Sequence, residues 1–229
     1  MIQLDNLFSR IFHSYELAKL NKDIKLTAFD WSGVISDDRM PVYLANMELF
    51  KIYKIPIITF EEWLPRTTLT PVEILKNHGA VDDADKIFAL YSKFYSNIVK
   101  SGTEPSVYPD TEEVFDYLNS KGLEVVVLSS HPKANLKKEA KKYKLNRYID
   151  SMLGSSKDKT KGLLEICSMK NKEPQSVLYA GDTIYDIQAA KQAGVISAGV
   201  CTGYHTRRRL QSENPDLLLS CLSDLKKVV

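Results

Sequence analysis

The sequence predicts an α/β protein: a three-layer, Rossmann-like parallel-sheet core with an α-helical cap domain inserted after its first strand. Three observations predict this class. Short apolar runs alternate with helical patterns from about residue 105 to residue 219. A similar apolar run already occurs near residue 26, well before that alternation begins. The stretch between them, residues 41–104, contains helical patterns and no strong strand.

The first elements follow from these patterns in chain order. Residues 4–20 place apolar side chains at helical spacing, which predicts an amphipathic N-terminal helix within residues 1–22, packed on the main domain. Residues 26–30, LTAFD, predict a buried strand that leads into a turn-prone loop. The predicted cap consists of helices at 41–54, 59–64, 70–78 and 82–99.

The rest of the predicted core domain is formed by residues 23–40 and 105–229. Its clearest strands are the apolar runs LEVVVLSS (123–130) and SVLYAGD (176–182). Weaker strands are predicted near 149–153, 195–200 and 217–219. Helices are predicted at 110–121, 133–143, 159–169 and 184–193. Strands that alternate with helices form a parallel sheet covered on both faces.

Composition and charge narrow the possible classes. The chain has 229 residues and 44% apolar residues, enough for one α/β core with a small inserted domain. A net charge of +2 gives no electrostatic argument for nucleic-acid or membrane partners. No apolar run approaches the ~20 residues that span a bilayer. Asp5 and Arg10 interrupt any signal-peptide-like stretch, and three cysteines without CxxC spacing predict reduced thiols in a cytoplasmic protein.

Polar residues gather where the predicted strands end. Ligands of open α/β sheets bind outside the carboxyl ends of the strands. The first strand ends at Asp30, the second at Ser129 and Ser130, and the fourth at Asp182. Asp186 follows four residues later, at the start of a predicted helix. These side chains are therefore expected to meet in one crevice.

These residue types suit phosphoryl transfer. Neighbouring carboxylates repel each other unless a cation neutralises them, and carboxylate oxygens suit Mg²⁺, which also accepts a phosphate oxygen. A carboxylate is also a nucleophile toward phosphorus. The basic loop at 157–161 offers lysines that would stabilise charge on the transferring group. Together these residues would suit magnesium-dependent chemistry on a small phosphorylated substrate.

Four segments resemble, in order, the motifs of the haloacid dehalogenase-like hydrolases, and in particular their phosphoglycolate phosphatase-like members with a helical cap. The first and second segments are FDWSGVISDD and VVVLSSHP. The third is the lysine-containing loop 157–161, and the fourth is VLYAGDTIYDIQAAKQAG. The resemblance covers nearly the whole chain after residue 25.

The resemblance implies a role for each matching acid. Asp30 would be the nucleophile, forming an aspartyl-phosphate, and also a ligand of Mg²⁺. Ser32 would give its backbone carbonyl to the metal, and Asp182 would be the second carboxylate ligand. Asp186 would be a ligand through water or a support for Asp182.

The resemblance also implies how the phosphoryl group is held. Ser129, with the amide of Ser130, would bind the phosphoryl oxygens. Lys159 would neutralise both the phosphate and Asp30. Lys157 is the other candidate for this lysine, because spacing to the fourth motif differs between branches of the family.

Ser32 is the position at which the chain departs from the family. Phosphatases of the family normally have a second Asp there, which protonates the leaving group. A serine hydroxyl is a poor proton donor near neutral pH. Three interpretations stay open. The protein is a slow phosphatase, or one whose leaving group needs no proton. Alternatively, another acid such as His131, Asp37 or Asp38 protonates the leaving group, or the protein catalyses different chemistry.

Two alternative functions follow from this departure. Phosphonoacetaldehyde hydrolases resemble the chain at D-W-x-G, but they need a cap lysine that forms a Schiff base. The matching stretch, residues 57–71, offers Arg66 and no lysine, and arginine cannot form that imine. The other alternative is a catalytically impaired protein that keeps the fold and binds a phosphorylated ligand. For either function we expect a monomer or a weak homodimer.

Outside the motifs, structural positions are expected. His205 is predicted to lie in a surface loop near the site, and residues 207–209 at a solvated helix start. Trp63 and Tyr43 are predicted to be core residues of the cap.

Overall fold

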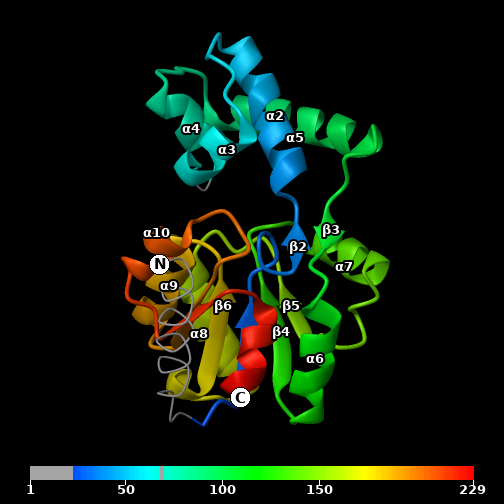
Figure 1. Cartoon of the computed structure of the whole chain (residues 1–229), viewed down its shortest axis with the longest axis vertical. Helices are drawn as coiled ribbons and strands as arrows, with labels where there is room; N and C mark the ends of the chain where they lie inside the picture. Colours follow the sequence, from blue (N-terminus) through cyan, green and yellow to red (C-terminus); the bar gives the residue numbers. More distant parts are fainter. Residues whose placement is uncertain (1–22, 68–69) are drawn as a thin grey trace, which may run out of the picture.

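The computed structural model describes residues 23–67 and 70–229. The predicted helix within residues 1–22 lies outside the described residues. The described chain forms two parts, a core built on a parallel sheet and a group of helices above it (Figure 1).

The core contains a six-stranded sheet in the order β5-β4-β1-β6-β7-β8, and all neighbouring strands are parallel. The register aligns Phe29 with Val127 on one side and with Ala180 on the other. Residues that follow these positions therefore emerge together at the carboxyl edge of the sheet. The strands are β1 (Leu26–Phe29), β4 (Glu124–Leu128), β5 (Ser151–Leu153), β6 (Val177–Gly181), β7 (Ile196–Val200) and β8 (Leu217–Leu219).

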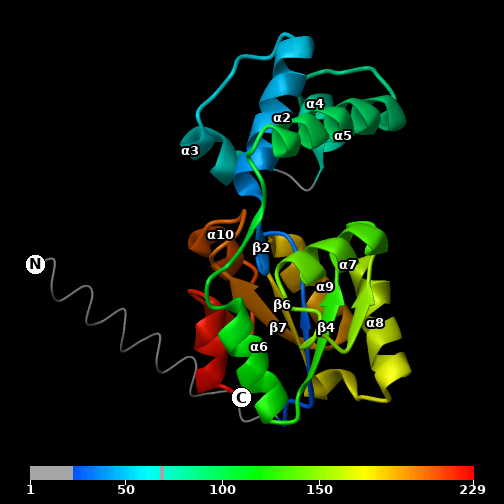
Figure 2. The same cartoon turned by 90° about the vertical axis from the view of Figure 1, so that its right-hand side faces the viewer.

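Helices cover both faces of the sheet, which confirms the predicted three-layer class (Figure 2). Phe29 packs with buried residues of one helical layer, and its neighbour Ala28 packs with the other. The first layer is α6 (Thr111–Ser120), α7 (Lys133–Lys142) and η3 (Leu222–Lys227). The second layer is α8 (Lys159–Lys170) and α9 (Ile184–Ala193), with the short η2 (Pro174–Ser176) and α10 (Arg207–Gln211) nearby in the chain.

The helix that follows β6 shows why the sequence folds this way locally. Thr183 and Asp186 form a capping box at the start of α9, with side chain and backbone bonding in both directions. Gly194 ends the helix in the left-handed conformation, at φ 73°. Both ends of α9 are therefore fixed by local sequence, and this fixes the direction in which the first turn presents Asp186.

Between residues 38 and 105 the regular elements of the described residues are all helices. A two-stranded antiparallel ribbon, β2 (Ser36–Asp37) with β3 (Ser106–Val107), leads into and out of this segment. The helices bury a separate apolar cluster that includes Leu49, Leu75 and Ile87. They are α2 (Arg39–Ile52), α3 (Phe60–Trp63), η1 (Leu64–Arg66), α4 (Pro71–Asn77) and α5 (Ala84–Lys100). We refer to this helical segment as the cap; its exact domain boundaries stay a prediction.

The two aromatic residues expected in the cap core pack as predicted. Trp63 is 2% exposed, and its ring lies 5.6 Å from that of Tyr43. Trp63 also contacts Tyr204 of the core, with ring centroids 6.2 Å apart. One aromatic contact thus joins cap and core.

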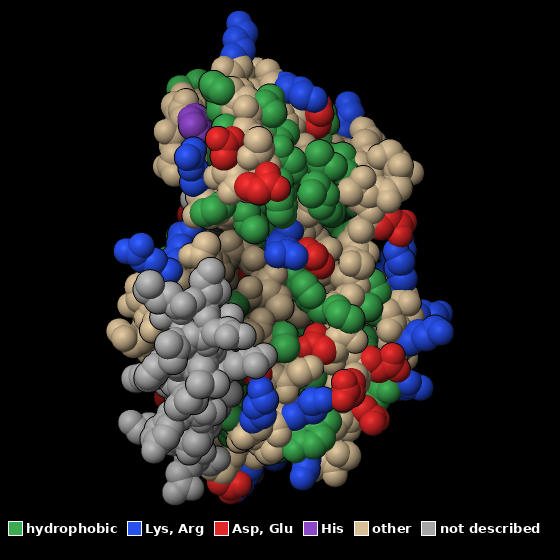
Figure 3. All heavy atoms as spheres, in the orientation of Figure 1, with side chains coloured by type: hydrophobic (Ala, Val, Ile, Leu, Met, Phe, Trp, Pro, Cys, Tyr) green, Lys and Arg blue, Asp and Glu red, His purple; other side chains and the backbone are tan. Residues whose placement is uncertain are grey.

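The surface carries mixed charge and few large apolar groups. Acidic and basic side chains are interspersed on the face shown in Figure 3. Among the described residues, the exposed large apolar side chains lie in the cap segment or on α8: Met40, Ile52, Ile57, Val81, Phe88, Leu164 and Met169. Within this described part of the chain, the helices are too short or too polar to cross a bilayer.

Candidate active site

Three buried aspartates meet at the carboxyl edge of the sheet. Asp30 follows β1, Asp182 follows β6, and Asp186 lies in the first turn of α9. One carboxylate oxygen from each lies within 4.8 Å of the others. The parallel register of β1 and β6 produces this meeting, because it places the ends of the two strands side by side.

A single lysine joins two of these acids. Lys159 is the first residue of α8, and its Nζ donates to Asp30 Oδ2 at 2.5 Å and to Asp186 Oδ1 at 2.5 Å. Burial acts to lower the pKa of Lys159, but attraction to Asp186 and Asp30 outweighs it and raises that pKa. Lys157, the other predicted candidate, is exposed to solvent. The structure therefore brings Lys159, and not Lys157, to the acids.

Hydrogen bonds surround the carboxylate of Asp186. Its Oδ1 accepts from Lys159 and from the hydroxyl of Tyr179 at 2.9 Å. Its Oδ2 accepts from the Thr183 amide at 3.0 Å and from the Thr183 hydroxyl at 2.5 Å. Burial opposes ionisation, but Lys159 and these donors lower the pKa of Asp186. With two donors on each oxygen, Asp186 holds Lys159 in place and would reach a metal only through water.

Sequence reasoning did not identify Tyr179 and Thr183 as site residues. Thr183 was detectable, because a threonine three residues before an acid is the pattern of a capping box. Tyr179 gave no signal, because an aromatic residue inside an apolar strand is ordinary for a buried sheet.

Asp182 is arranged differently from Asp186. Its Oδ2 accepts the Tyr204 amide at 2.7 Å, and among the described residues no donor is bonded to its Oδ1. Two glycines crowd it: a Cβ added at Gly33 or Gly203 would lie 2.2 Å or 2.0 Å from Oδ2. Burial, with repulsion from Asp186 and Asp30, raises the pKa of Asp182 well above its usual value. Asp182 thus has a free oxygen and lacks a cation of its own.

Asp30 is held by one donor on each oxygen. The Trp31 amide donates to Oδ1 at 2.7 Å, and Lys159 donates to Oδ2. Burial raises the pKa of Asp30, while Lys159 lowers it and Asp186 adds to the rise. The two donors fix the orientation of the carboxylate, which is what a nucleophile positioned for in-line attack requires.

The charge of this cluster fits a divalent cation. Three carboxylates face one lysine, so full ionisation leaves two negative charges in a buried place. The donors are hard oxygens, which suit Mg²⁺ better than softer metals. Asp30 and Asp182 are the acids with capacity left for such an ion.

Ser32 occupies the position at which related phosphatases have an acid, and its side chain contacts the carboxylate of Asp38. Its hydroxyl lies 2.6 Å from both oxygens of Asp38, and the Tyr204 hydroxyl donates to Asp38 Oδ1 at 2.8 Å. Burial raises the pKa of Asp38, although His131 and the two hydroxyls act to lower it. Asp37, the neighbouring candidate acid, is bound through both oxygens by Arg39.

The remaining predicted residues are placed as follows. Ser129 is buried beside the end of β4, and its hydroxyl accepts the His131 amide at 3.2 Å. Ser130 is exposed to solvent. The prediction for His205 was wrong: it is 3% exposed, and its Nδ1 accepts the Ile184 amide at 2.9 Å. Burial and Arg209 lower the pKa of His205 to about 4, so this imidazole is neutral near pH 7.

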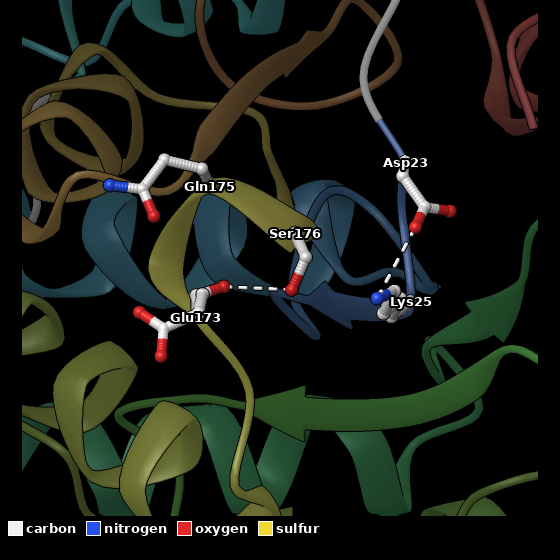
Figure 4. A pocket seen from close by; sticks show the side chains of 5 residues that line it. All are labelled: Asp23, Lys25, Glu173, Gln175 and Ser176. Carbon is white, nitrogen blue, oxygen red and sulfur yellow. Dashed lines mark hydrogen bonds and ion pairs between the residues drawn. The ribbon is translucent and has the colours of Figure 1, made fainter.

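A hollow of about 280 Å³ lies at the opposite end of the sheet (Figure 4). Lys25 and Ser176, which line it, directly precede β1 and β6. Asp23 and Lys25 form an exposed ion pair there at 3.2 Å. The hollow is therefore far from the carboxyl edge of the strands, where ligands of such sheets bind.

Comparison with known proteins identifies similar chains. The sequence model of the haloacid dehalogenase-like hydrolases matches residues 27–200. A probable phosphoglycolate phosphatase of Pseudomonas putida is 30% identical over 155 residues, covering 65% of this chain but only 61% of that protein. A phosphoglycolate phosphatase of Shigella dysenteriae is 24% identical over 89% of this chain and 92% of its own. A predicted phosphoglycolate phosphatase from Haemophilus somnus shares the fold, with a TM-score of 0.75 and 18% identity over 91% of this chain and 99% of that one.

Proposed function

The chain belongs to the haloacid dehalogenase-like hydrolase family, and from that premise we propose that it is a magnesium-dependent phosphatase of small phosphomonoesters. The observation that carries this proposal is the ion pair of Lys159 with both Asp30 and Asp186 beside a third buried acid. This set offers a nucleophile, a cation for the phosphoryl group and a place for a metal in one crevice.

In the proposed reaction, an Asp30 oxygen attacks phosphorus. The bond from Asp30 to phosphorus forms as the ester bond to the leaving alcohol breaks, and an aspartyl-phosphate results. Water then attacks phosphorus, phosphate leaves and the Asp30 carboxylate is restored. Lys159, held by Asp186, stabilises negative charge on the phosphoryl oxygens throughout. Ser129 is proposed to bind the same oxygens from the end of β4.

Asp30 and Asp182 would hold the Mg²⁺, with the Ser32 carbonyl as the predicted third protein oxygen and Asp186 in contact through water. When bound, Mg²⁺ supplies positive charge that offsets the acids and the phosphate oxygens. The close approach of Gly33 and Gly203 to Asp182 Oδ2 leaves no room for a side chain beside this carboxylate.

The substrate proposal is a small phosphomonoester, with phosphoglycolate first in the panel. Two relatives are named for phosphatase action on that compound. A cytoplasmic location and a monomeric or weakly dimeric state remain predictions.

A binding protein without turnover is the second candidate, and Ser32 is the observation that favours it. A serine alone would leave the alkoxide of an ordinary ester unprotonated. Both candidates predict Mg²⁺ and phosphate binding, so turnover separates them. The phosphonatase alternative has no further support, because Arg66 is exposed and offers no amine for an imine.

The test is phosphate release from a panel of alkyl phosphomonoesters and p-nitrophenyl phosphate, with Mg²⁺ and with chelator. Wild type is expected to turn over only with Mg²⁺, and Asp30→Asn to lose about 10³-fold or more of that rate. Asp116→Asn, on the exposed side of α6, serves as the matched control and should keep wild-type activity. Binding of Mg²⁺ and phosphate without any turnover would overturn the proposal and favour the binding protein.

A further inference from the structure

The Ser32 hydroxyl and the Asp38 carboxylate form a close pair that no step described above uses. Ser32 Oγ lies 2.6 Å from both oxygens of Asp38, which is 2% exposed. Asp38 stands at the N-cap of α2, where an aspartate ordinarily accepts a backbone amide of the helix. Its side chain makes no capping bond. The carboxylate is therefore directed away from its own helix and toward Ser32.

The local fold of the loop after Asp30 creates this pair. The amides of Ile35 and Ser36 both donate to the Trp31 carbonyl, at 2.9 and 2.8 Å. Gly33, at φ +75°, allows the chain to reverse in the left-handed conformation, and its amide donates to the Ser36 carbonyl. This tight turn folds residue 38 back onto residue 32, two positions after the proposed nucleophile.

Tyr204 shows that the pair borders the acid cluster. Its amide donates to Asp182, and its hydroxyl donates to Asp38. Tyr204 therefore bridges Asp38 and Asp182, the proposed metal ligand. Among the other acids considered at this edge, Asp37 is occupied by Arg39 on both oxygens. Asp38 is the acid that the fold delivers to the hydroxyl beside the nucleophile.

Cleavage of an alkyl phosphomonoester needs a proton at this place. The departing alkoxide is a strong base, and a positioned acid accelerates such a step by about 10²–10⁴-fold. A serine hydroxyl in contact with a carboxyl group can hand over its own proton and take another in the same step. The serine and the carboxyl group together thus provide the proton donor that a serine alone does not provide.

Resting on the phosphatase function above, we propose that Ser32 and Asp38 together form the proton relay of this site. As the ester bond breaks, the leaving oxygen takes the Ser32 hydroxyl proton, and Ser32 takes the proton of the Asp38 carboxyl group. In the second step the attacking water gives a proton to Ser32, which passes its own to Asp38 while the bond from phosphorus to Asp30 breaks. Ester and water become alcohol and phosphate, and both residues return to their starting forms. Ser32 contacts the reacting oxygens, and Asp38 acts through it.

The experiment compares two leaving groups in Asp38→Asn and in its neighbour Asp37→Asn. The measured quantity is kcat/KM, which reports the steps up to the aspartyl-phosphate. The substrates are the fastest alkyl ester of the panel, whose leaving group needs a proton, and p-nitrophenyl phosphate, whose leaving group does not. We expect Asp38→Asn to lower kcat/KM about 10²-fold for the alkyl ester and less than about threefold for p-nitrophenyl phosphate. Asp37→Asn should shift both substrates equally and by little.

Two further measurements keep the outcome decisive. Acid-quenched Asp38→Asn should accumulate phosphorylated enzyme on p-nitrophenyl phosphate, because its second step lacks the base. Ser32→Asp placed in the Asp38→Asn chain should restore the alkyl-ester rate at least tenfold, since it returns an acid to the same place. If Asp38→Asn does not fold, Ser32→Ala carries the same comparison of leaving groups.

Equal losses on both substrates would assign Asp38 a purely structural role and overturn the relay. A selective loss in His131→Gln, and none in Asp38→Asn, would assign the proton to His131 and overturn it as well. A wild-type chain that cleaves p-nitrophenyl phosphate but no alkyl ester would overturn the relay and leave the phosphatase proposal standing. Turnover of neither substrate would contradict the phosphatase proposal itself.

Discussion

Two carboxylate regions lie at the same edge of the sheet, and they differ in how their charge is balanced. Asp186 is bonded by Lys159 and has a lowered pKa in spite of burial. Asp38 is equally hidden from solvent, is hydrogen-bonded by two hydroxyls and has a raised pKa. The contrast shows that the two hydroxyls at Asp38 do not offset its burial, whereas Lys159 together with the Thr183 and Tyr179 donors does so at Asp186.

This contrast also separates two chemical tasks. A carboxylate kept ionised can hold a lysine and, with its neighbours, a metal. A carboxyl group whose pKa is raised is a better match for proton transfer near neutral pH. Sites that run acid and base chemistry near neutral pH depend on such pairs of groups with separated pKa values.

The largest expected effect comes from removing the lysine. Lys159→Met leaves three buried acids without their cation, which should lower the free energy of unfolding by about 3–5 kcal/mol without metal. The midpoint of urea denaturation, measured with chelator and with Mg²⁺, checks this. Mg²⁺ should recover part of the loss, because it replaces the missing charge. An unchanged midpoint in chelator would contradict the account of Asp186 as the lysine's partner.

Weakening the hydroxyl support of Asp186 should have a smaller effect. Thr183→Val removes a capping hydroxyl and a buried hydrogen bond at once, so unfolding should become easier by about 1–3 kcal/mol. Thr160→Val is the control, because its hydroxyl bonds Gln192 at the surface, and it should stay within about 0.5 kcal/mol of wild type. Equal destabilisation of the two variants would show that the capping box carries no special weight.

His205 extends the comparison to a buried base that has no hydrogen-bonded acid within the described part of the chain. Its folded pKa of about 4 lies below the value of about 6.5 for an unfolded histidine. As pH falls from about 6.5 to about 4, His205 binds a proton in the unfolded chain but not in the folded chain. The free energy of unfolding therefore decreases in that pH window. His205→Asn should remove about 1–2 kcal/mol of this pH dependence. Denaturation midpoints of both chains at pH 7 and pH 4.5 measure it, and parallel curves would refute it.

The smallest effect is expected at the other lysine of the loop. Lys157 is exposed, so Lys157→Ala should change the free energy of unfolding by less than about 0.5 kcal/mol and the rate by less than about twofold. Phosphate release beside Lys159→Met measures this difference directly. A large loss in Lys157→Ala would mean that the loop rearranges when substrate binds.

The sequence was sufficient to predict the sheet and the meeting of the acids, because both depend on regular rules. Parallel strands end at one edge, so residues that follow β1 and β6 must come together. The sequence could not choose between Lys157 and Lys159, since both flank Asp158 in the same loop. The choice depends on where α8 begins: Asp158 caps it, and Lys159 takes the first helical position.

Other features of the site depend on contacts between distant segments, and no local pattern reports them. Tyr204 reaches Asp38 across 166 positions of the chain. Asp38 carried the pattern of an ordinary helix cap, and its departure from that role becomes visible only in three dimensions. The prediction for His205 was wrong for a related reason. A polar residue in a loop predicts exposure, but here the side chain is buried and accepts the Ile184 amide, which has no partner within its own helix α9.

The ion pair between Lys159 and Asp30 has a consequence for how the protein acquires activity during folding. The two residues are 129 positions apart, and the whole cap and half of the core lie between them in the chain. A contact of such long range forms only when the chain between its two residues has closed into a loop. The acids would therefore remain without their lysine in any partly folded chain. Recovery of activity after refolding should coincide with the last cooperative phase, and a chain cut anywhere between these two residues should regain function only when both pieces dock.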